Sequence, residues 1–301
     1  YTQTGGTVNI RLQGENHGGP MLGLSSTNSV FNMSGGTLNF TSNNFSKGST
    51  DFQLMNIAAQ AGNYQVTGGT VNLNLPSSGT AYTAISSVPF SNVNLTNQTG
   101  SGITTVQWSA PYPLTILNNL IIGSGSVLDL NTNTINLNVG QNFTVTGTYT
   151  PGNNTTTFNG SGGQVLTNSG TITTGLNNFV LINGSNTTIS NDLTIGGTLT
   201  INSSCFLNDQ GNTINIRGNI SNSGTHASQA NGSIILNGGA AQTVGGSGNG
   251  VFGNFTVNKT AGTSTLTSNQ AITGNLRLVT GILNLATFNL RLSAGSNIYD
   301  F

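Results

Sequence analysis

Charge is scarce in this sequence. Charged residues make up 4% of the 301 residues, as six cations and six acids, and the formal net charge is 0. Nucleic-acid binding needs a basic surface that displaces phosphate counterions, and attachment to anionic lipid also needs clustered basic residues. Six scattered cations supply neither. No apolar run approaches the roughly 18 residues of a membrane-spanning helix. We therefore expect no nucleic-acid partner and no membrane insertion.

Cysteine is almost absent, which excludes an intrachain disulfide, because Cys205 is the only one. Cys205 shares the parity of Leu199, Ile201 and Ser203 in an alternating segment. That pattern predicts a small core residue rather than a reactive thiol.

Four residue types fill more than half of the chain: 46 Asn, 45 Thr, 43 Gly and 31 Ser. Abundant Gly and Asn disfavour helices. Hydrophobic residues still reach 34%, and a disordered chain usually carries much more charge. Within segments the apolar residues alternate with polar ones, as at Ile135, Leu137 and Val139. A period of two is typical of a strand with one buried face, so the sequence predicts an all-β protein.

Internal repeats decide between all-β architectures. The motif Ser/Thr-Gly-Gly-Thr-Val/Leu-Asn begins at Thr4, Ser34 and Thr67, so it returns after 30 residues and then after 33 residues. A longer repeat occupies the rest of the chain, because Asn-Thr-Ile-Asn at 133–136 returns at 212–215. The change of repeat predicts two continuous subregions, residues 1–110 and 111–301.

Short strands in the shorter repeat favour a solenoid, the parallel β-helix, in which each turn buries its inward residues on the next. We expect Asn, Ser and Thr on successive turns to form hydrogen-bonded ladders along the axis. Tandem β-sandwich domains are the alternative, since the longer repeat has nearly the length of one immunoglobulin-like domain. Such domains favour one core tryptophan each, whereas Trp108 is the only tryptophan.

The segments 117–122, 133–137 and 157–165, together with the Ser/Thr-Gly-Gly-Thr motif, resemble repeat regions of large surface proteins from Bacteroidetes. The resemblance covers nearly the whole chain. It implies a right-handed parallel β-helix in a secreted adhesin or gliding-type protein exported by the type IX secretion system. The C-terminal sorting domain of that family is not visible in the sequence. We expect the chain to be an internal stretch of a longer protein.

The sequence contains no established catalytic motif. Glycoside hydrolysis needs two carboxylates a few ångström apart, and Asp192 and Asp209 are the best pair, although each lies in a turn-forming context. The sequence predicts no metal ligands, because His17 and His226 are far apart in sequence and Cys205 has no cysteine partner at ligand spacing. Glu15, Asn16 and His17 are predicted to form a loop. We therefore predict no catalytic residue, no cofactor and no metal site, with calcium binding left open.

Glycine-rich residues 245–250 are predicted to form a turn rather than a phosphate loop, since no Lys-Ser/Thr and no helix follows.

Binding fits the composition better. Thr144, Thr146, Thr148 and Thr150 form the longest threonine row, which would suit glycans or ordered water, although threonine also simply favours exposed strands. Candidate platforms for sugar stacking are Tyr82, Trp108, Tyr112 and Tyr149.

The sequence thus predicts an extracellular structural or adhesive stalk segment without catalysis, located at the cell surface. Its expected partners are other segments of the same long chain, secretion or surface-anchoring proteins, and a glycan or abiotic surface. A polysaccharide lyase or hydrolase and an ice-binding or glycan-binding solenoid are the alternatives.

Overall fold

The computed structural model describes residues 1–12, 19–42, 52–77 and 80–301. The predicted loop at Glu15, Asn16 and His17 lies outside the described residues. The chain forms two compact units, one of residues 1–154 with 168–173 (unit 1) and one of residues 155–167 with 174–301 (unit 2). Every regular element in the described part is a β-strand, and no helix there is long and apolar enough to cross a membrane.

Unit 1 repeats short strands that return to the same sheet once per turn, or rung, of the chain. Its longest sheet contains β2 (Thr7–Leu12), β5 (Thr37–Ser42), β8 (Thr70–Leu75), β10 (Asn92–Asn97), β13 (Leu120–Ile122) and β16 (Phe143–Val145). A second sheet contains β3 (Leu22–Leu24), β6 (Phe52–Ile57), β9 (Tyr82–Ser86), β11 (Thr104–Trp108), β14 (Ser126–Asp129), β17 (Thr148–Thr150) and β20 (Thr171–Ile172). The third side has β1 (Thr2–Gln3), β4 (Phe31–Met33) and β7 (Tyr64–Val66), and then β12 (Leu114–Ile116) and β15 (Leu137–Val139).

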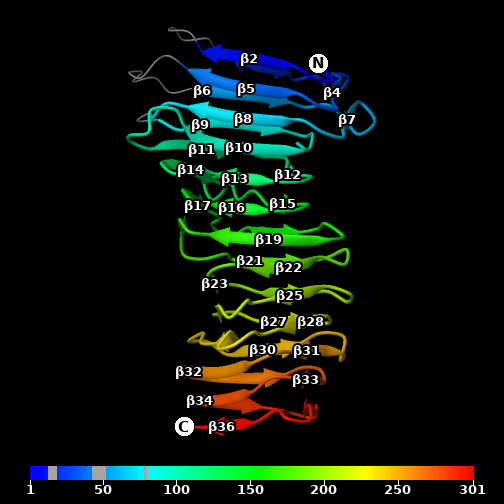
Figure 1. The fold of residues 1–301 in the computed structure, drawn as a ribbon, viewed down its shortest axis with the longest axis vertical. Helices are drawn as coiled ribbons and strands as arrows, with labels where there is room; N and C mark the ends of the chain where they lie inside the picture. Colours follow the sequence, from blue (N-terminus) through cyan, green and yellow to red (C-terminus); the bar gives the residue numbers. More distant parts are fainter. Residues whose placement is uncertain (13–18, 43–51, 78–79) are drawn as a thin grey trace. The chain divides into compact units, whose positions relative to one another are not determined.

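Each interval between copies of the Ser/Thr-Gly-Gly-Thr motif corresponds to a single rung. Thr7 pairs in parallel with Thr37, and Thr37 with Thr70, so equivalent residues of the motif lie side by side on β2, β5 and β8 (Figure 1). Later rungs are shorter, because Val71 pairs with Val93 and Val93 with Leu120. The repeats therefore fix the register of the sheet.

The core of unit 1 consists of stacked apolar columns. The strictly alternating strands bury every second residue, as in β8 and β11. Aromatic rings link the rungs, with the ring of Phe90 edge-on to Phe31 at 6.0 Å and to Trp108 at 6.1 Å between centroids. Burying one such large apolar side chain contributes about 1.5–3 kcal/mol.

Each rung of unit 2 also consists of three strands. One sheet contains β19 (Gly163–Asn168), β22 (Asn186–Ile189), β25 (Phe206–Asn208), β28 (Thr225–Ala227), β31 (Gly250–Phe252), β33 (Gln270–Ile272) and β35 (Leu290–Leu292). A second series is β23 (Leu193–Ile195), β26 (Thr213–Ile216) and β29 (Ser233–Leu236), and a third is β18 (Thr155–Phe158), β21 (Asn178–Leu181), β24 (Leu199–Ile201), β27 (Ile220–Asn222) and β30 (Gln242–Gly245).

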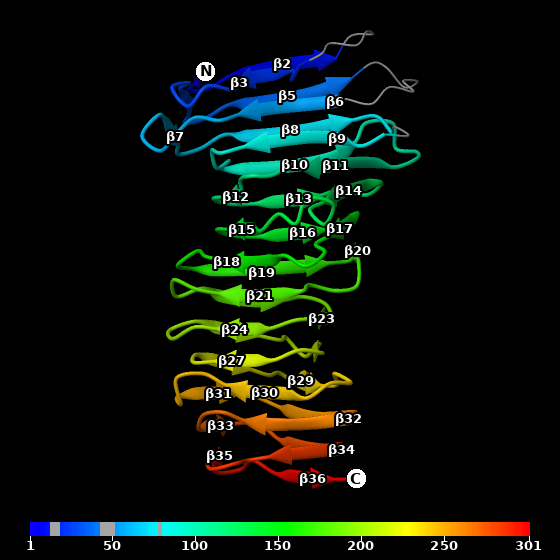
Figure 2. The same ribbon diagram turned by 180° about the vertical axis from the view of Figure 1, so that it is seen from behind.

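The long strand β32 (Phe255–Leu266) joins the second and third series of unit 2. Its first residues pair with β29 and its last with β30 (Figure 2). It is followed by β34 (Leu276–Asn284), which pairs with β32, and then by β36 (Ile298–Asp300). Stacked partners of the second series recur at nearly even intervals along the chain, at Leu193, Ile214, Ile234, Phe255, Leu276 and Ile298.

Each unit is therefore a parallel β-helix, which confirms the predicted solenoid class. The tandem β-sandwich alternative is wrong, since that fold is built from antiparallel strands. Cys205 is 2% exposed, as predicted for a core residue. Residues 246–249 connect β30 to β31, within the segment 245–250 that was predicted to form a turn.

Candidate binding surfaces

The outer face of the longest sheet in unit 1 carries a ladder of amides, formed by Asn9, Asn39, Asn72 and Asn94 (the amide ladder). Each side-chain Nδ2 donates to the Oδ1 of the preceding rung, over 2.8 Å from Asn39 to Asn9, 2.8 Å from Asn72 to Asn39 and 3.0 Å from Asn94 to Asn72. The parallel pairing of neighbouring strands aligns each asparagine with the asparagine of the next rung. The predicted polar ladder is confirmed for these rungs.

A neighbouring polar column widens this face. The hydroxyl of Thr96 donates to Asn74 Oδ1 over 3.0 Å. Asn74 in turn pairs with Thr41, which lies one rung earlier. A shallow hollow lies between the two columns, lined by Asn39, Thr41, Asn72, Asn74, Asn94 and Thr96. The hollow offers neutral donors and acceptors only, which suits hydroxyl-rich partners rather than ionic ones.

Asparagines at the corners of the rungs have a different task, since they accept backbone N–H groups from the following rung. The distances run from 2.8 to 3.3 Å in the pairs Asn119–Asn92, Asn142–Asn119, Thr198–Asn178, Thr243–Asn219, Asn275–Asn254, Asn289–Asn269 and Asn297–Asn275, donor first. Backbone N–H groups that leave the strand ladder at a corner still need acceptors. Corner capping therefore accounts for seven of the 46 asparagines.

Asp192 occupies one of these corner positions. Its Oδ1 accepts the backbone N–H of Thr213 over 2.7 Å, as an asparagine does elsewhere. The side chain is exposed. The turn-forming interpretation of Asp192 thus agrees with its geometry, and the carboxylate is engaged with the backbone of the next rung.

Asp209 lies at a corner of the neighbouring rung, but its side chain is 0% exposed. Its Oδ1 accepts the N–H of Gly211 at 2.9 Å and that of Gln229 at 3.1 Å. Its Oδ2 lies 3.2 Å from Nε2 of His226, which is also 0% exposed. The N–H of Gly253 donates to His226 Nδ1 over 3.3 Å, so Nε2 carries the proton and donates to Asp209.

Two opposed effects act on the pKa of Asp209. Burial of the carboxylate raises the pKa, whereas hydrogen bonds from His226, Ser228 and the backbone of Gly211 and Gln229 lower it. The hydrogen bonds outweigh burial, so the pKa lies below its ordinary value of 3.8. Asp209 is therefore a buried carboxylate that joins its own rung to the next one, and His226 extends the contact to Gly253 on the rung after that.

The Asp209–His226 contact was not predicted from the sequence. The signal was present as a spacing of 17 residues. That spacing becomes meaningful only when the length of one rung is known, because rung length decides which corners are adjacent.

Lys259 makes a second buried polar cluster, and its side chain is 1% exposed. Its Nζ donates to the carbonyl oxygens of Gly238 and Ala240, the latter over 2.8 Å, and to Gln242 Oε1 over 2.7 Å. Burial lowers its pKa. Three acceptors match the three donors of an ammonium group, so Lys259 holds the turn between β29 and β30 in place.

The predicted threonine row is divided between two sheets. Thr144 lies on β16 beside Ile121, whereas Thr148 and Thr150 lie on β17 beside Val127 and Asp129. The row is therefore not a single flat array. A threonine column does occur elsewhere, where the pairing of Thr7, Thr37 and Thr70 ends at Asn92.

Three of the four proposed aromatic platforms are wrong. Tyr82, Trp108 and Tyr149 are at most 1% exposed and belong to the core of unit 1. Burial also raises the pKa of Tyr82 to about 12, and its hydroxyl donates to the Pro76 carbonyl over 3.2 Å. Tyr112 alone is partly exposed. In strands of strict alternation, parity decides burial, and these rings share the apolar parity.

Among the described residues, no three or more His, Cys, Asp or Glu side chains gather as metal ligands do. No protein-family model, curated protein or solved structure matches this chain. Function has to be inferred from the side chains that the two units present.

Proposed function

We propose that this chain is an extracellular structural and adhesive segment of a large bacterial cell-surface protein, and that it performs no catalysis. The observation that carries the proposal is the amide ladder, where one neutral side chain bonds to the next along the solenoid at 2.8 to 3.0 Å. Such ladders reinforce the backbone hydrogen bonds between rungs. A sheet braced in this way suits a stalk that holds binding elements away from the cell.

The state of the acids supports a role without hydrolysis. A glycosidase needs two carboxylates that flank the scissile bond of a polymer. Asp209 is fully buried and Asp192 caps the Thr213 N–H, so the best pair from the sequence offers no open acid and base. Asp129 is likewise held by the hydroxyl and backbone of its own turn at Thr132.

The proposed cell-surface location and type IX export depend on the resemblance of the repeats to Bacteroidetes surface proteins. The proposed partners are further segments of the same long chain, secretion or anchoring proteins, and a glycan or abiotic surface. Neutral amides and hydroxyls would make these contacts by hydrogen bonds, which are less sensitive to salt than contacts between exposed charges.

The test combines turnover and adhesion. We expect the purified chain to release no reducing ends and no unsaturated uronates from a panel of pectin, alginate, xylan and chitin. Beads coated with the chain should adhere to glycan-coated or mineral surfaces above beads coated with heat-denatured chain, and adhesion should change less than about twofold between 50 and 200 mM salt.

Turnover that disappears in Asp192→Asn or Asp209→Asn would contradict the proposal and favour the polysaccharide enzyme. Thermal hysteresis of ice growth would favour the ice-binding alternative. Adhesion that falls tenfold over the same salt range would show that ionic contacts dominate.

A further inference from the structure

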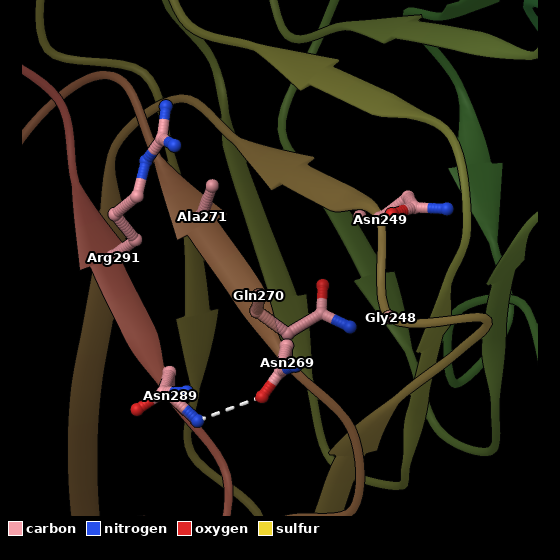
Figure 3. A pocket seen from close by; sticks show the side chains of 8 residues that line it. Gly248, Asn249, Asn269, Gln270, Ala271, Asn289 and Arg291 are labelled. Atoms are coloured by element: carbon pink, nitrogen blue, oxygen red, sulfur yellow. Dashed lines mark hydrogen bonds between the residues drawn. The ribbon is translucent and has the colours of Figure 1, made fainter.

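A pocket in unit 2 carries polar groups that the structural role of the solenoid does not use. It is lined by Gly248, Asn249, Gly250, Asn269, Gln270, Ala271, Asn289 and Arg291 (the Arg291 pocket) (Figure 3). These residues come from the turn before β31 and from β33 and β35, which are consecutive strands of one sheet. None of the lining residues is acidic.

Three asparagines form one edge of the Arg291 pocket. Gly250 pairs with Gln270 and Gln270 with Leu290, so the preceding residues Asn249, Asn269 and Asn289 follow one another on consecutive rungs. All three side chains are exposed. Asn269 Oδ1 accepts the backbone N–H of Asn289 over 2.9 Å, which leaves its Nδ2 to donate outward.

Arg291 supplies the only charge among the lining residues. It pairs with Ala271, and Ala271 pairs with Val251, so small or apolar residues flank it on the outer face of the sheet. Figure 3 shows the guanidinium beside Ala271, clear of the asparagines. Within the described residues no acid pairs with Arg291, and its side chain is exposed.

Gln270 gives the floor of the pocket an acceptor without a donor. The residue is 3% exposed, and its Nε2 donates to Ser268 Oγ over 3.0 Å and to the Asn222 carbonyl over 3.3 Å. Its Oε1 is buried and has no hydrogen-bond partner among the described residues. A buried acceptor left in this state is costly. The oxygen lies on the inward side of Gly250, where a Cβ would be 2.2 Å from it.

We propose that the Arg291 pocket binds a carboxylated sugar, the uronate unit of an acidic polysaccharide. The planar guanidinium of Arg291 binds the carboxylate with two parallel N–H donors. The asparagine amides bind the ring hydroxyls. One cation surrounded by several neutral amides matches a ligand with one anionic group and several hydroxyls.

The test measures binding of trigalacturonate to the full chain by calorimetry and by 15N NMR. We expect Arg291→Gln to weaken binding at least tenfold, and Arg291→Lys to give an intermediate affinity because lysine keeps the charge but not the fork. The fully methyl-esterified trisaccharide keeps the hydroxyls and loses the charge, so it should bind at least tenfold more weakly. Signals of Gly248, Gly250 and the Gln270 amide should shift on binding.

Arg277→Gln is the matched control. Arg277 is also exposed, but its guanidinium lies 5.7 Å from the centre of the Tyr299 ring and lines no part of the pocket. Its replacement should leave trigalacturonate affinity unchanged, and circular dichroism should show that both variants fold.

Four results would overturn the uronate site: no measurable binding, equal affinity in Arg291→Gln, equal affinity of the methyl ester, or binding of a sulfated carrageenan oligosaccharide in place of the uronate. The inference rests on the proposed adhesive function and adds one ionic contact, through Arg291, to the neutral contacts of that function. The two fail separately, because polysaccharide turnover contradicts the function whereas an unaffected Arg291→Gln variant contradicts only the site.

Discussion

Replacing Asp209 by asparagine should destabilise unit 2 even though the two side chains have the same shape. The carboxylate accepts two backbone N–H groups through Oδ1 and the His226 Nε2–H through Oδ2. Asparagine keeps the first oxygen but turns an NH2 donor toward a histidine nitrogen that is already a donor. The other tautomer of His226 gives no relief, because its Nδ1–H would then face the Gly253 N–H.

The magnitude follows from the lost contacts. A hydrogen bond to a charged group contributes about 1.5–3 kcal/mol, and a buried donor left without an acceptor costs about 1–3 kcal/mol. Asparagine also removes the desolvation cost of a buried charge, which offsets part of this loss of stability. We expect Asp209→Asn to lower the free energy of unfolding by about 2–4 kcal/mol at pH 7.

The pH dependence has a definite sign. Because the pKa of Asp209 is lower in the folded chain than its ordinary 3.8, the carboxylate stabilises the fold above pH 3.8 and loses this contribution as pH falls through the lower folded value. The part of the difference between wild type and Asp209→Asn that comes from the Asp209 carboxylate should therefore shrink as the pH falls below 3.8.

Urea unfolding followed by far-ultraviolet circular dichroism measures the difference, and hydrogen exchange at the amides of Gly211, Gln229 and Gly253 reports the local loss. Asp192→Asn is the control, because it removes the same charge at a corner where asparagine is the usual residue, and it should change stability by less than about 0.5 kcal/mol. The reasoning is refuted if both variants behave alike at pH 7, or if the effect of Asp209→Asn is the same at pH 2.5.

Three further substitutions test other parts of the fold by the same urea assay. Asn72→Ala breaks two bonds of the amide ladder and should cost about 1–2 kcal/mol, twice the effect of Asn9→Ala, which breaks one; equal effects would show that the ladder adds no stability. Lys259→Met leaves three buried acceptors without their donor and should cost about 3 kcal/mol, whereas a neutral result would mean that water replaces the ammonium group. Gly140→Ala puts a Cβ 1.9 Å from a carbonyl oxygen of the adjacent rung and should cost more than about 3 kcal/mol of stability. The control Gly162→Ala meets nothing within 4 Å and should leave stability unchanged. A well-folded Gly140→Ala chain would contradict the close packing of the corners.

The class of fold could be predicted from the sequence, because two of the signals are local. Alternation of apolar and polar residues specifies a strand with one buried face wherever it occurs, and Cys205 followed that parity into the core. The Ser/Thr-Gly-Gly-Thr motif returned at the length of one rung, so equivalent residues such as Thr7 and Thr37 had to meet in register. The same repetition made the asparagine ladder predictable.

Which polar groups meet around the corners depends on the stacking of the rungs and could not be predicted from local patterns. One series of unit 2 advances from Leu193 to Ile214 in a rung, while Asp209 and His226 meet across a shorter stretch of chain, and no local pattern distinguishes such spacings. The threonine row of 144–150 was continuous in sequence but bends from one sheet to another. Tyr82, Trp108 and Tyr149 could be assigned to the core only once the parity of each strand was fixed by its neighbours. Burial and hydrogen bonding depend on the adjacent rung, and the chain reaches that rung only after a full turn.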